Sequence, residues 1–370
     1  MSEYSELRGR IQRFMLDATR DVDKNGEDYD RTTIAGYDER IGHIEGERVK
    51  RFVIHFRSRG CLWQHINGGC SMCGFWEETT QFKVRVSAAD FVTQFTKALD
   101  DHHLGSYPVL SLYNAGSLLQ EEETPFSAVE EICHLIARQL PELKRLIIES
   151  RVEYITREKL LSLQKILGSQ TQLALGIGFE SENDLVRNVL VNKGASKRVF
   201  ERVVDLTSSL DIHSIVYLLV KPPFLTEREA IEDVVNSCRY VSDVGVREIN
   251  LETMTVEAKT LVSTLHEKGL YALPWLWSIV EVLERTAAFA DPFLTPFSYI
   301  AESVATPRNC RLCSERVIDR IYNQYCSDFD RSHLVGLHCA CKSEWLRATS
   351  ETSSSDLHTR ALDMLDACGA

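Results

Sequence analysis

Three cysteines lie within thirteen residues of this 370-residue chain, Cys61, Cys70 and Cys73, with the spacing Cys-x8-Cys-x2-Cys. They follow the apolar run Phe52–Phe56, whose composition predicts a strand, so we expect the thiols to occupy a loop at its carboxyl end. In α/β folds, the loops at that end of parallel strands carry the chemistry. Four glycines border the thiols and let the backbone fold tightly around a bulky group, including at positive φ: Gly60, Gly68, Gly69 and Gly74.

The number of thiols is informative. Three thiolates are one fewer than the four that close a structural zinc site or saturate an ordinary iron–sulfur cluster. A four-iron cluster held by three thiolates keeps one iron open. The spacing resembles the cluster loop of the radical S-adenosylmethionine (SAM) superfamily, in a variant with a longer first gap, as in the Elongator catalytic subunit group. That resemblance implies that the open iron chelates the amino and carboxylate groups of SAM. The alternative is a zinc knuckle that takes its fourth ligand from elsewhere in the chain.

The composition, 44% hydrophobic and 26% charged, is typical of a globular protein. No run of eighteen apolar residues occurs, and the first residues lack a basic-then-apolar signal, so we expect a cytoplasmic protein without a membrane partner. Eleven cysteines in a reducing compartment favour metal or redox chemistry over disulfides. We expect Cys133 and Cys238 to be core residues. The formal net charge of −12 weighs against transfer RNA as a partner, although Lys50, Arg51, Arg57 and Arg59 could form a local basic patch. The alternative is that these cations are partners of the SAM carboxylate and the anionic cluster.

From residue 52 onward, apolar runs with β character alternate with amphipathic helical segments. The expected strands are 52–56, 109–113, 146–149, 173–179, 212–220 and 248–251, and the expected helices are 88–100, 127–139, 157–167, 197–210, 226–242 and 256–268. Six β-then-α units with right-handed crossovers predict an α/β fold, a partial (β/α)6 TIM-type barrel. We expect a helical or irregular extension over 1–50, the core barrel over 51–290, an irregular cysteine-rich subdomain over 291–345, and a flexible or weakly helical tail over 346–370.

Polar residues that follow the second and third strands are candidates for cofactor binding. Gly116 permits close backbone approach and Ser117 offers a hydroxyl, which suits the amino group of an amino-acid cofactor; a plain turn is the alternative. Glu149 and Arg151 share one face of an extended chain and could together bind a zwitterion, or they could form a solvated ion pair.

The fourth and fifth strands also end in charged residues. Glu180 emerges from an apolar strand and needs a partner or a place at the mouth of the barrel, and Lys193 follows shortly after. Lys221 closes the fifth strand. If it is buried it is a functional candidate, and if it is exposed it simply ends the strand.

These motifs occur in a fixed order along the chain: Cys61/Cys70/Cys73 with Gly68-Gly69, Gly116-Ser117-Leu118-Leu119, Glu149-Ser150-Arg151, Gly178-Phe179-Glu180, Asn192-Lys193-Gly194, Lys221-Pro222-Pro223-Phe224-Leu225-Thr226-Glu227 and Pro274-Trp275-Leu276-Trp277-Ser278. As a set they resemble the archaeosine-synthesis radical SAM lyase family, over about residues 50–345. The resemblance implies a partial TIM-type barrel with a [4Fe-4S] cluster and SAM. Its archaeal members look like lyases that complete the archaeosine base on transfer RNA by cutting a lysine-bearing adduct.

Carried over by position, the resemblance implies a role for each motif residue. The catalytic cluster is held by the three thiols, Met72 packs on the adenine, Gly116-Ser117 contacts the SAM amino group, and further cofactor-binding residues are Phe75, Glu149, Arg151, Glu180 and Lys193. A reductant such as ferredoxin or flavodoxin is expected as a partner. The segments 251–256 and 272–273 depart from the archaeal pattern where substrate specificity is usually set. A related small biosynthetic molecule is therefore a plausible substrate beside the lysine-bearing base.

A second group of thiols lies near the C-terminus, at Cys310, Cys313, Cys339 and Cys341. Four thiols at this spacing are enough for a tetrahedral structural zinc site, which is the first interpretation. An auxiliary iron–sulfur cluster, or free thiols that grip a soft substrate atom, are the alternatives. His338 or Cys326 could replace one ligand.

The leading hypothesis is a radical SAM enzyme of lyase or transferase type that starts radical chemistry on a substrate in the barrel. One rival transfers the 3-amino-3-carboxypropyl group of SAM to a small-molecule acceptor held by the C-terminal thiols. A rival of another class is a non-catalytic zinc-binding RNA adaptor.

Overall fold

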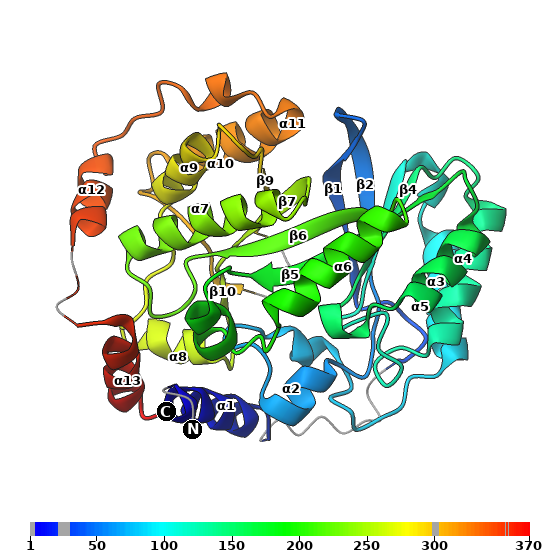
Figure 1. Cartoon of the computed structure of the whole chain (residues 1–370), viewed down its shortest axis with the longest axis horizontal. Coiled ribbons are helices and arrows are strands. Elements are labelled where there is room, and N and C mark those ends of the chain that lie inside the picture. Colours follow the sequence, from blue (N-terminus) through cyan, green and yellow to red (C-terminus); the bar gives the residue numbers. More distant parts are fainter. Residues whose placement is uncertain (1–3, 21–29, 298–302, 352, 354) are drawn as a thin grey trace.

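An eight-stranded sheet curls around a central cavity in the computed structural model, which describes residues 4–20, 30–297, 303–351, 353 and 355–370 (Figure 1). The strand order is β1-β2-β3-β4-β5-β6-β7-β9. β1 pairs antiparallel with β2, and all later neighbours are parallel. The strands are β1 (Gly36–Ile44), β2 (Glu47–His55), β3 (Val109–Tyr113), β4 (Arg145–Glu149), β5 (Gln172–Glu180), β6 (His213–Val220), β7 (Glu248–Thr253) and β9 (Phe293–Leu294). The six predicted strands are confirmed as β2 to β7, and β1 was not predicted.

Helices that follow the strands cover the outer face of this sheet. They are α3 (Ala88–Asp101), α4 (Phe126–Gln139), α5 (Arg157–Leu167), α6 (Lys197–Ser209) and α7 (Glu227–Asp243), which confirm the first five predicted helices. The sixth, α8 (Leu261–Glu267), begins later than expected, because Val256–Glu257 forms β8 and pairs with β10 (Ser303–Ala305). No helix in the described part of the chain is long and apolar enough to cross a membrane.

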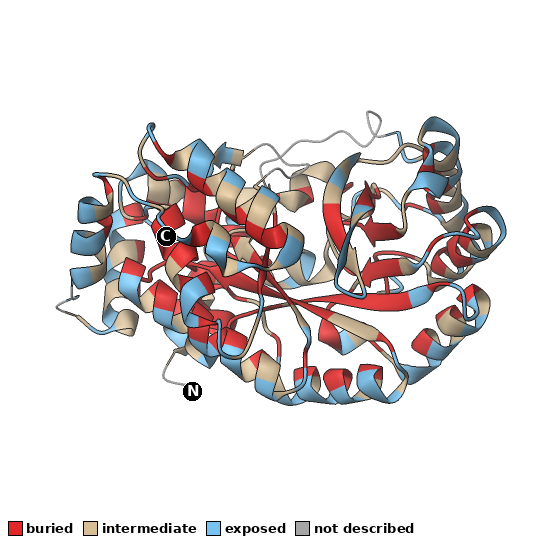
Figure 2. Cartoon of the chain, turned by 90° about the horizontal axis from the view of Figure 1, so that it is seen from above, coloured by how far each residue is buried: buried red, intermediate tan, exposed pale blue. Residues whose placement is uncertain are grey.

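The alternation of side chains along each strand separates the packed core from the cavity. In β3, Leu110 and Leu112 pack under the outer helices, whereas Tyr113 lines the cavity. In β5, Leu175 and Ile177 likewise pack outward. Figure 2 shows the result as a buried sheet flanked by helices that expose one side. Cys133 and Cys238 lie fully buried in this outer core, as expected.

The two ends of the described chain lie side by side (Figure 1). α1 (Ser5–Arg20) contacts α13 (Leu357–Cys368), and the Arg10 guanidinium donates to the Ala370 carbonyl at 2.6 Å and pairs with Asp366 at 2.7 Å. Ala361 and Leu365 of α13 are fully buried. The helical stretch expected in the tail is α13, which docks against the rest of the molecule because its apolar residues are regularly spaced.

The segment 291–345 is more helical than the expected irregular subdomain. It holds α10 (Ser314–Ile318), the π-helical turn Asp319–Tyr325 and α11 (Cys326–Asp328) in succession. Val317, Ile321 and Tyr325 are fully buried at a spacing of four, which is the signal for one helical face. The remaining elements are α2 (Leu62–Asn67), α9 (Leu276–Arg285), α12 (Lys342–Ser350), the 3-10 turns Phe75–Glu78, Leu104–Ser106, Val152–Tyr154 and Arg331–Leu334, and the π-helical turn Val186–Leu190.

Candidate active site

A cavity of about 280 Å³ lies inside the sheet at the carboxyl ends of its strands. It is lined by ten of the eleven cluster and cofactor residues that the sequence predicts: Cys61, Cys70, Met72, Cys73, Phe75, Gly116, Glu149, Arg151, Glu180 and Lys193. The eleventh, Ser117, is fully buried behind the wall, where its Oγ accepts a hydrogen bond from the Arg151 amide at 3.1 Å. One cavity therefore gathers residues from loops that are up to 130 positions apart in the sequence.

The loop with the three thiols starts directly after β2. Cys61 precedes α2, and Cys70 and Cys73 lie in one turn, in which the Cys73 amide donates to the Cys70 carbonyl at 3.0 Å. Gly68 and Gly69 have φ angles of +80° and +75°. A Cβ on Gly68 would lie only 2.7 Å from the Gln12 carbonyl oxygen, so α1 packs directly on this loop.

Asn192 fastens the loop to the rest of the barrel. Its side-chain amide nitrogen donates to the carbonyls of Asn67 at 3.0 Å and Gly69 at 2.7 Å. Its Oδ1 accepts from Gln12 at 3.1 Å, which adds α1 to the same contact. The residue is fully buried and has a φ of +56°. Asparagine tolerates this left-handed conformation better than most residues. The backbone can therefore direct the side-chain NH2 group toward the loop carbonyls and Oδ1 toward Gln12.

Trp63 in α2 extends this attachment. Its indole nitrogen donates to the Asn192 carbonyl at 2.7 Å. The Arg151 guanidinium lies 4.8 Å from the Trp63 ring centre and donates to the Lys193 carbonyl at 2.8 Å. Gly194, with a φ of +66°, packs against the indole so closely that an added Cβ would overlap the ring.

Glu123 is a site residue that sequence reasoning missed. Its carboxylate accepts from the Leu62 amide at 2.8 Å and from the Ser117 amide, so it joins the thiol loop to the loop after β3. Burial raises the pKa of Glu123 to about 7. In the sequence it ends the run Glu121-Glu122-Glu123, which is typical of a solvated turn and gives no signal of burial.

Burial of the three thiols penalises their thiolate forms. Burial raises the pKa of Cys61 to about 12, and it also raises the pKa values of Cys70 and Cys73. A metal ion is the kind of group that holds such thiols in the deprotonated form. The ammonium of Lys193 pairs with Glu180 at 2.7 Å, and its positive charge opposes the rise in the pKa of Cys70. The thiol end of the cavity thus combines three potential ligands with fixed positive charge.

The inner end of the cavity is a buried polar network. Arg51 donates to Ser111 at 2.7 Å and to the Tyr113 hydroxyl, which lies 2.8 Å from the Tyr217 hydroxyl. Glu149 accepts a hydrogen bond from the Tyr217 side chain. Burial, together with the neighbouring Glu252 carboxylate, raises the pKa of Glu149 to about 7.

Several polar atoms on the cavity wall have no partner within the described chain. They are the Nε of Arg40 and of Arg151, the Oδ1 of Asn250, the Oγ1 of Thr253 and the Oε2 of Glu257. Buried polar groups that lack partners cost free energy. Their presence in one cavity indicates that bound molecules supply the missing hydrogen bonds.

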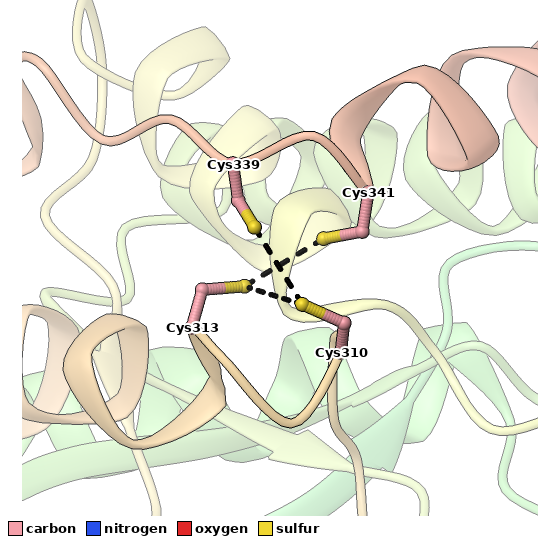
Figure 3. A group of neighbouring side chains, drawn as sticks. All are labelled: Cys310, Cys313, Cys339 and Cys341. Carbon is pink, nitrogen blue, oxygen red and sulfur yellow. Dashed lines mark hydrogen bonds between the residues drawn. The ribbon is translucent and has the colours of Figure 1, made fainter.

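The four C-terminal thiols converge at a separate place (Figure 3). The Sγ distances are 3.7 Å for Cys310 to Cys313, 3.5 Å for Cys310 to Cys339, and 3.6 Å for Cys313 to Cys341. All four ligand atoms lie within 4.8 Å of one another. None of them lines the cavity described above. The Leu312 amide lowers the pKa of Cys310 to about 7, which favours a thiolate there.

Two residues that were considered as substitute ligands lie outside this group. Cys326 is fully buried, and its Sγ accepts from the Leu294 amide at 3.2 Å. His338 contacts the Gly336 carbonyl at 2.9 Å through Nδ1. The fifth-strand candidate Lys221 is buried but pairs with Glu227 at 2.5 Å outside the cavity, so it joins the core and not the site.

The chain is similar in sequence to two curated proteins named archaeosine synthase subunit beta. It is 31% identical to that of Methanosarcina acetivorans over 304 residues, which cover 82% of this chain and 86% of the relative. It is 28% identical to that of Thermococcus kodakarensis over 305 residues, which cover 82% and 93%. No family model matches. Among solved structures, coproporphyrinogen III oxidase from Escherichia coli, a radical SAM enzyme, is similar with a TM-score of 0.42 and 15% identity, over 64% of this chain and 50% of that one.

Proposed function

Because the chain belongs to the archaeosine synthase subunit beta family, a radical SAM family, we propose that it binds a [4Fe-4S] cluster and SAM in the cavity inside the sheet. The observation that carries the proposal is that Cys61, Cys70 and Cys73 all line the one cavity inside the sheet, together with charged side chains such as Arg151 and Lys193. The bound cluster supplies the electron that cleaves SAM reductively and so provides a 5′-deoxyadenosyl radical.

The chain's own residues hold the reactants in place. Cys61, Cys70 and Cys73 bind the cluster, and Glu123 and Asn192 fix the loop that carries them. This placement keeps the thiols in one geometry while the cavity excludes bulk water.

Residues of the neighbouring loops bind SAM. Arg151, whose Nε is buried without a partner, binds the SAM carboxylate, and the backbone at Gly116 approaches the SAM amino group. Met72 packs on the adenine. Glu180 and Lys193 form an ion pair and, together with Phe75, line the same cavity.

The inner end of the cavity binds the substrate. Two half-buried residues, Glu149 and Glu252, have carboxylates close enough that one raises the pKa of the other. A positively charged group between them relieves that repulsion. Asn250, Thr253 and Arg40 offer further hydrogen bonds. The lysine-bearing base implied by the family resemblance carries such an amine, and we propose a lyase or modification reaction on it or on a related small biosynthetic molecule.

A structural zinc ion is the group that the C-terminal thiols suit best. Four ligands at 2.3 Å from a tetrahedral zinc ion are about 3.8 Å apart, which is close to the observed 3.5 to 3.7 Å. Thiols that each bind a different iron of a cluster must lie farther apart. The zinc ion would tie the turn at Cys310 and Cys313 to the start of α12, and the Trp277 indole donates to Cys341 at 3.4 Å.

Other candidate functions receive less support. An acceptor held by the C-terminal thiols would need access to SAM, and none of those thiols lines the cavity. A zinc-binding adaptor would not need a cavity that gathers three further thiols and four cationic side chains, those of Arg40, Arg51, Arg151 and Lys193. The relatives' name, subunit beta, suggests a second polypeptide as a partner, in addition to a reductant.

The decisive experiment is anaerobic reconstitution with iron and sulfide, followed by dithionite, SAM and mass spectrometry of the products. We expect about four irons bound at Cys61, Cys70 and Cys73 and the formation of 5′-deoxyadenosine. Each of the three Cys→Ala variants should lose both, whereas Cys310→Ala should lose zinc and keep the iron. Methylthioadenosine would instead indicate aminocarboxypropyl transfer, and a protein that binds zinc but no iron would refute the proposal.

A further inference from the structure

The helix between the first two cluster thiols has an unused outer face. α2 contains no buried residue, and His65 and Ile66 are exposed, Ile66 by 60%. None of the residues 62–69 lines the cavity. α2 lies beside α1 at the edge of the molecule (Figure 1). This face therefore belongs neither to the SAM site nor to the substrate end of the cavity.

We define the α2 face by five residues: Arg59, His65, Ile66, Phe82 and Lys83. Phe82 joins three of them, because the Arg59 guanidinium lies 4.6 Å from its ring centre and His65 stacks on that ring at 4.5 Å and 16°. Ile66 is next to His65 in the chain. Lys83 follows Phe82 and is exposed. The face thus presents an exposed apolar residue beside stacked aromatic rings and cationic side chains.

The charge of this face differs from that of the whole molecule. The chain carries a formal net charge of −12, yet α2 has no acidic residue in its first turn and none in its sequence LWQHIN. The Arg59 guanidinium borders the acidic loop at Glu122 through a hydrogen bond to its carbonyl at 3.2 Å. Arg59 and Lys83 are the two cationic side chains of this face, so an acidic partner meets less repulsion here than the net charge of the whole chain would give.

The α2 face is also close to the thiols. Ile66 follows Cys61 by five residues, and a helical rise of about 1.5 Å per residue places it about 7.5 Å along the helix from that thiol. Cys70 lies four residues beyond Ile66. A protein docked on this face is therefore near the cluster and on the side away from the cavity.

We propose that the α2 face is the docking site of the acidic one-electron carrier protein that reduces the cluster. This inference rests on the proposed function, because it requires a cluster on Cys61, Cys70 and Cys73. In the step, one electron passes from the reduced carrier to the cluster. The carrier is oxidised by one electron and the cluster is reduced by one, and no bond or proton is exchanged.

The test compares a protein reductant with a small one. Reduced flavodoxin serves as the carrier probe, and dithionite, which needs no docking surface, serves as the reference. Flavodoxin binding is measured by interferometry at low salt, and cluster reduction by stopped-flow absorbance. Ile66→Asp and Lys83→Glu should each weaken binding and slow flavodoxin-driven reduction about tenfold, while dithionite-driven reduction stays unchanged.

Two matched variants sharpen the comparison. Lys144→Glu makes the same charge change at the amino end of β4, opposite the thiol loop, and should have no effect. Glu122→Lys adds positive charge next to Arg59 and should strengthen binding and speed the reduction. Higher ionic strength should shrink all of these differences.

Each contrary result has a separate meaning. Equal flavodoxin binding and reduction in wild type, Ile66→Asp and Lys83→Glu would overturn the proposal, and so would a cluster that dithionite reduces but flavodoxin does not. If Ile66→Asp also loses iron, the decision rests on Lys83→Glu, whose side chain is exposed on a loop. Transfer RNA that displaces flavodoxin from wild type and fails to bind Lys83→Glu would assign the face to RNA and overturn the proposal. A wild type that binds no iron would refute the proposed function itself.

Discussion

Gly194 offers a sharp test of how the thiol loop is held, because the chain contains a matched control. Gly194 and Gly369 both have a positive φ, +66° and +78°, and Gly369 adopts the left-handed conformation. An added Cβ at Gly369 would meet nothing within 4 Å, whereas at Gly194 it would overlap the indole of Trp63. Substitution of each by alanine therefore separates backbone strain from crowding at the loop.

The expected magnitudes follow from these contacts. Alanine in the left-handed region costs about 1–2 kcal/mol, which is the whole expected effect of Gly369→Ala. Gly194→Ala adds about 1–3 kcal/mol for forcing Trp63 aside. The displaced indole also loses its hydrogen bond to the Asn192 carbonyl, which is worth about 1 kcal/mol. We therefore expect Gly194→Ala to lower the free energy of unfolding by about 3–6 kcal/mol.

The assay combines urea unfolding with iron analysis after anaerobic reconstitution. Gly369→Ala should bind iron as the parent does, while Gly194→Ala should lose most of it, because Trp63 and Arg151 no longer hold the loop. The intrinsic fluorescence of Trp63 should also change in Gly194→Ala alone. Equal unfolding free energies and equal iron contents in the two variants would show that Gly194 does not position this loop, and the reasoning would then be wrong.

Three further predictions address other parts of the structure. Asn192→Ala removes two hydrogen bonds to the loop carbonyls, so iron retained after desalting should fall well below that of the exposed control Asn236→Ala; equal retention would contradict the attachment. Cys341→Ser should reduce bound zinc from about one ion per chain to nearly none and lower the Tm, as measured by metal analysis and calorimetry, while iron at the cavity persists. Burial raises the pKa of Asp233 to about 7, so the folded state holds this proton more tightly than the unfolded chain. Its contribution to stability is full below about pH 4 and is lost as the pH rises to 7. The unfolding free energy should therefore decline over this range in the parent and decline less in Asp233→Asn; parallel curves would contradict the assignment.

The barrel itself could be predicted because its signals are local. Each strand from β2 to β7 is an apolar run of a few residues, and each of α3 to α7 repeats its apolar face every three or four residues. Both patterns are visible within a short window of sequence. The thiol loop could be found for the same reason, since Cys61, Cys70 and Cys73 are close together in the chain.

β1 was missed because its cavity side is polar. Asp38 pairs with His55 at 3.1 Å and with Arg40 at 2.7 Å, and Arg40 lines the cavity. A strand with charged residues on its inward face lacks the apolar alternation that identifies a strand. β8 was predicted as the start of a helix because the strand with which it pairs is far away in the sequence. That strand, β10, begins 47 residues after Val256.

By itself, the sequence determined the order of elements, the positions of both thiol groups and most of the residues around the cavity, because each depends on neighbours in the chain. Only the tertiary structure decided how the thiol loop is held. Asn192 reaches residues more than 120 positions away, and Glu123 joins loops about 60 positions apart. A buried carboxylate or amide has the same side chain as an exposed one, and its environment exists only after distant segments have packed.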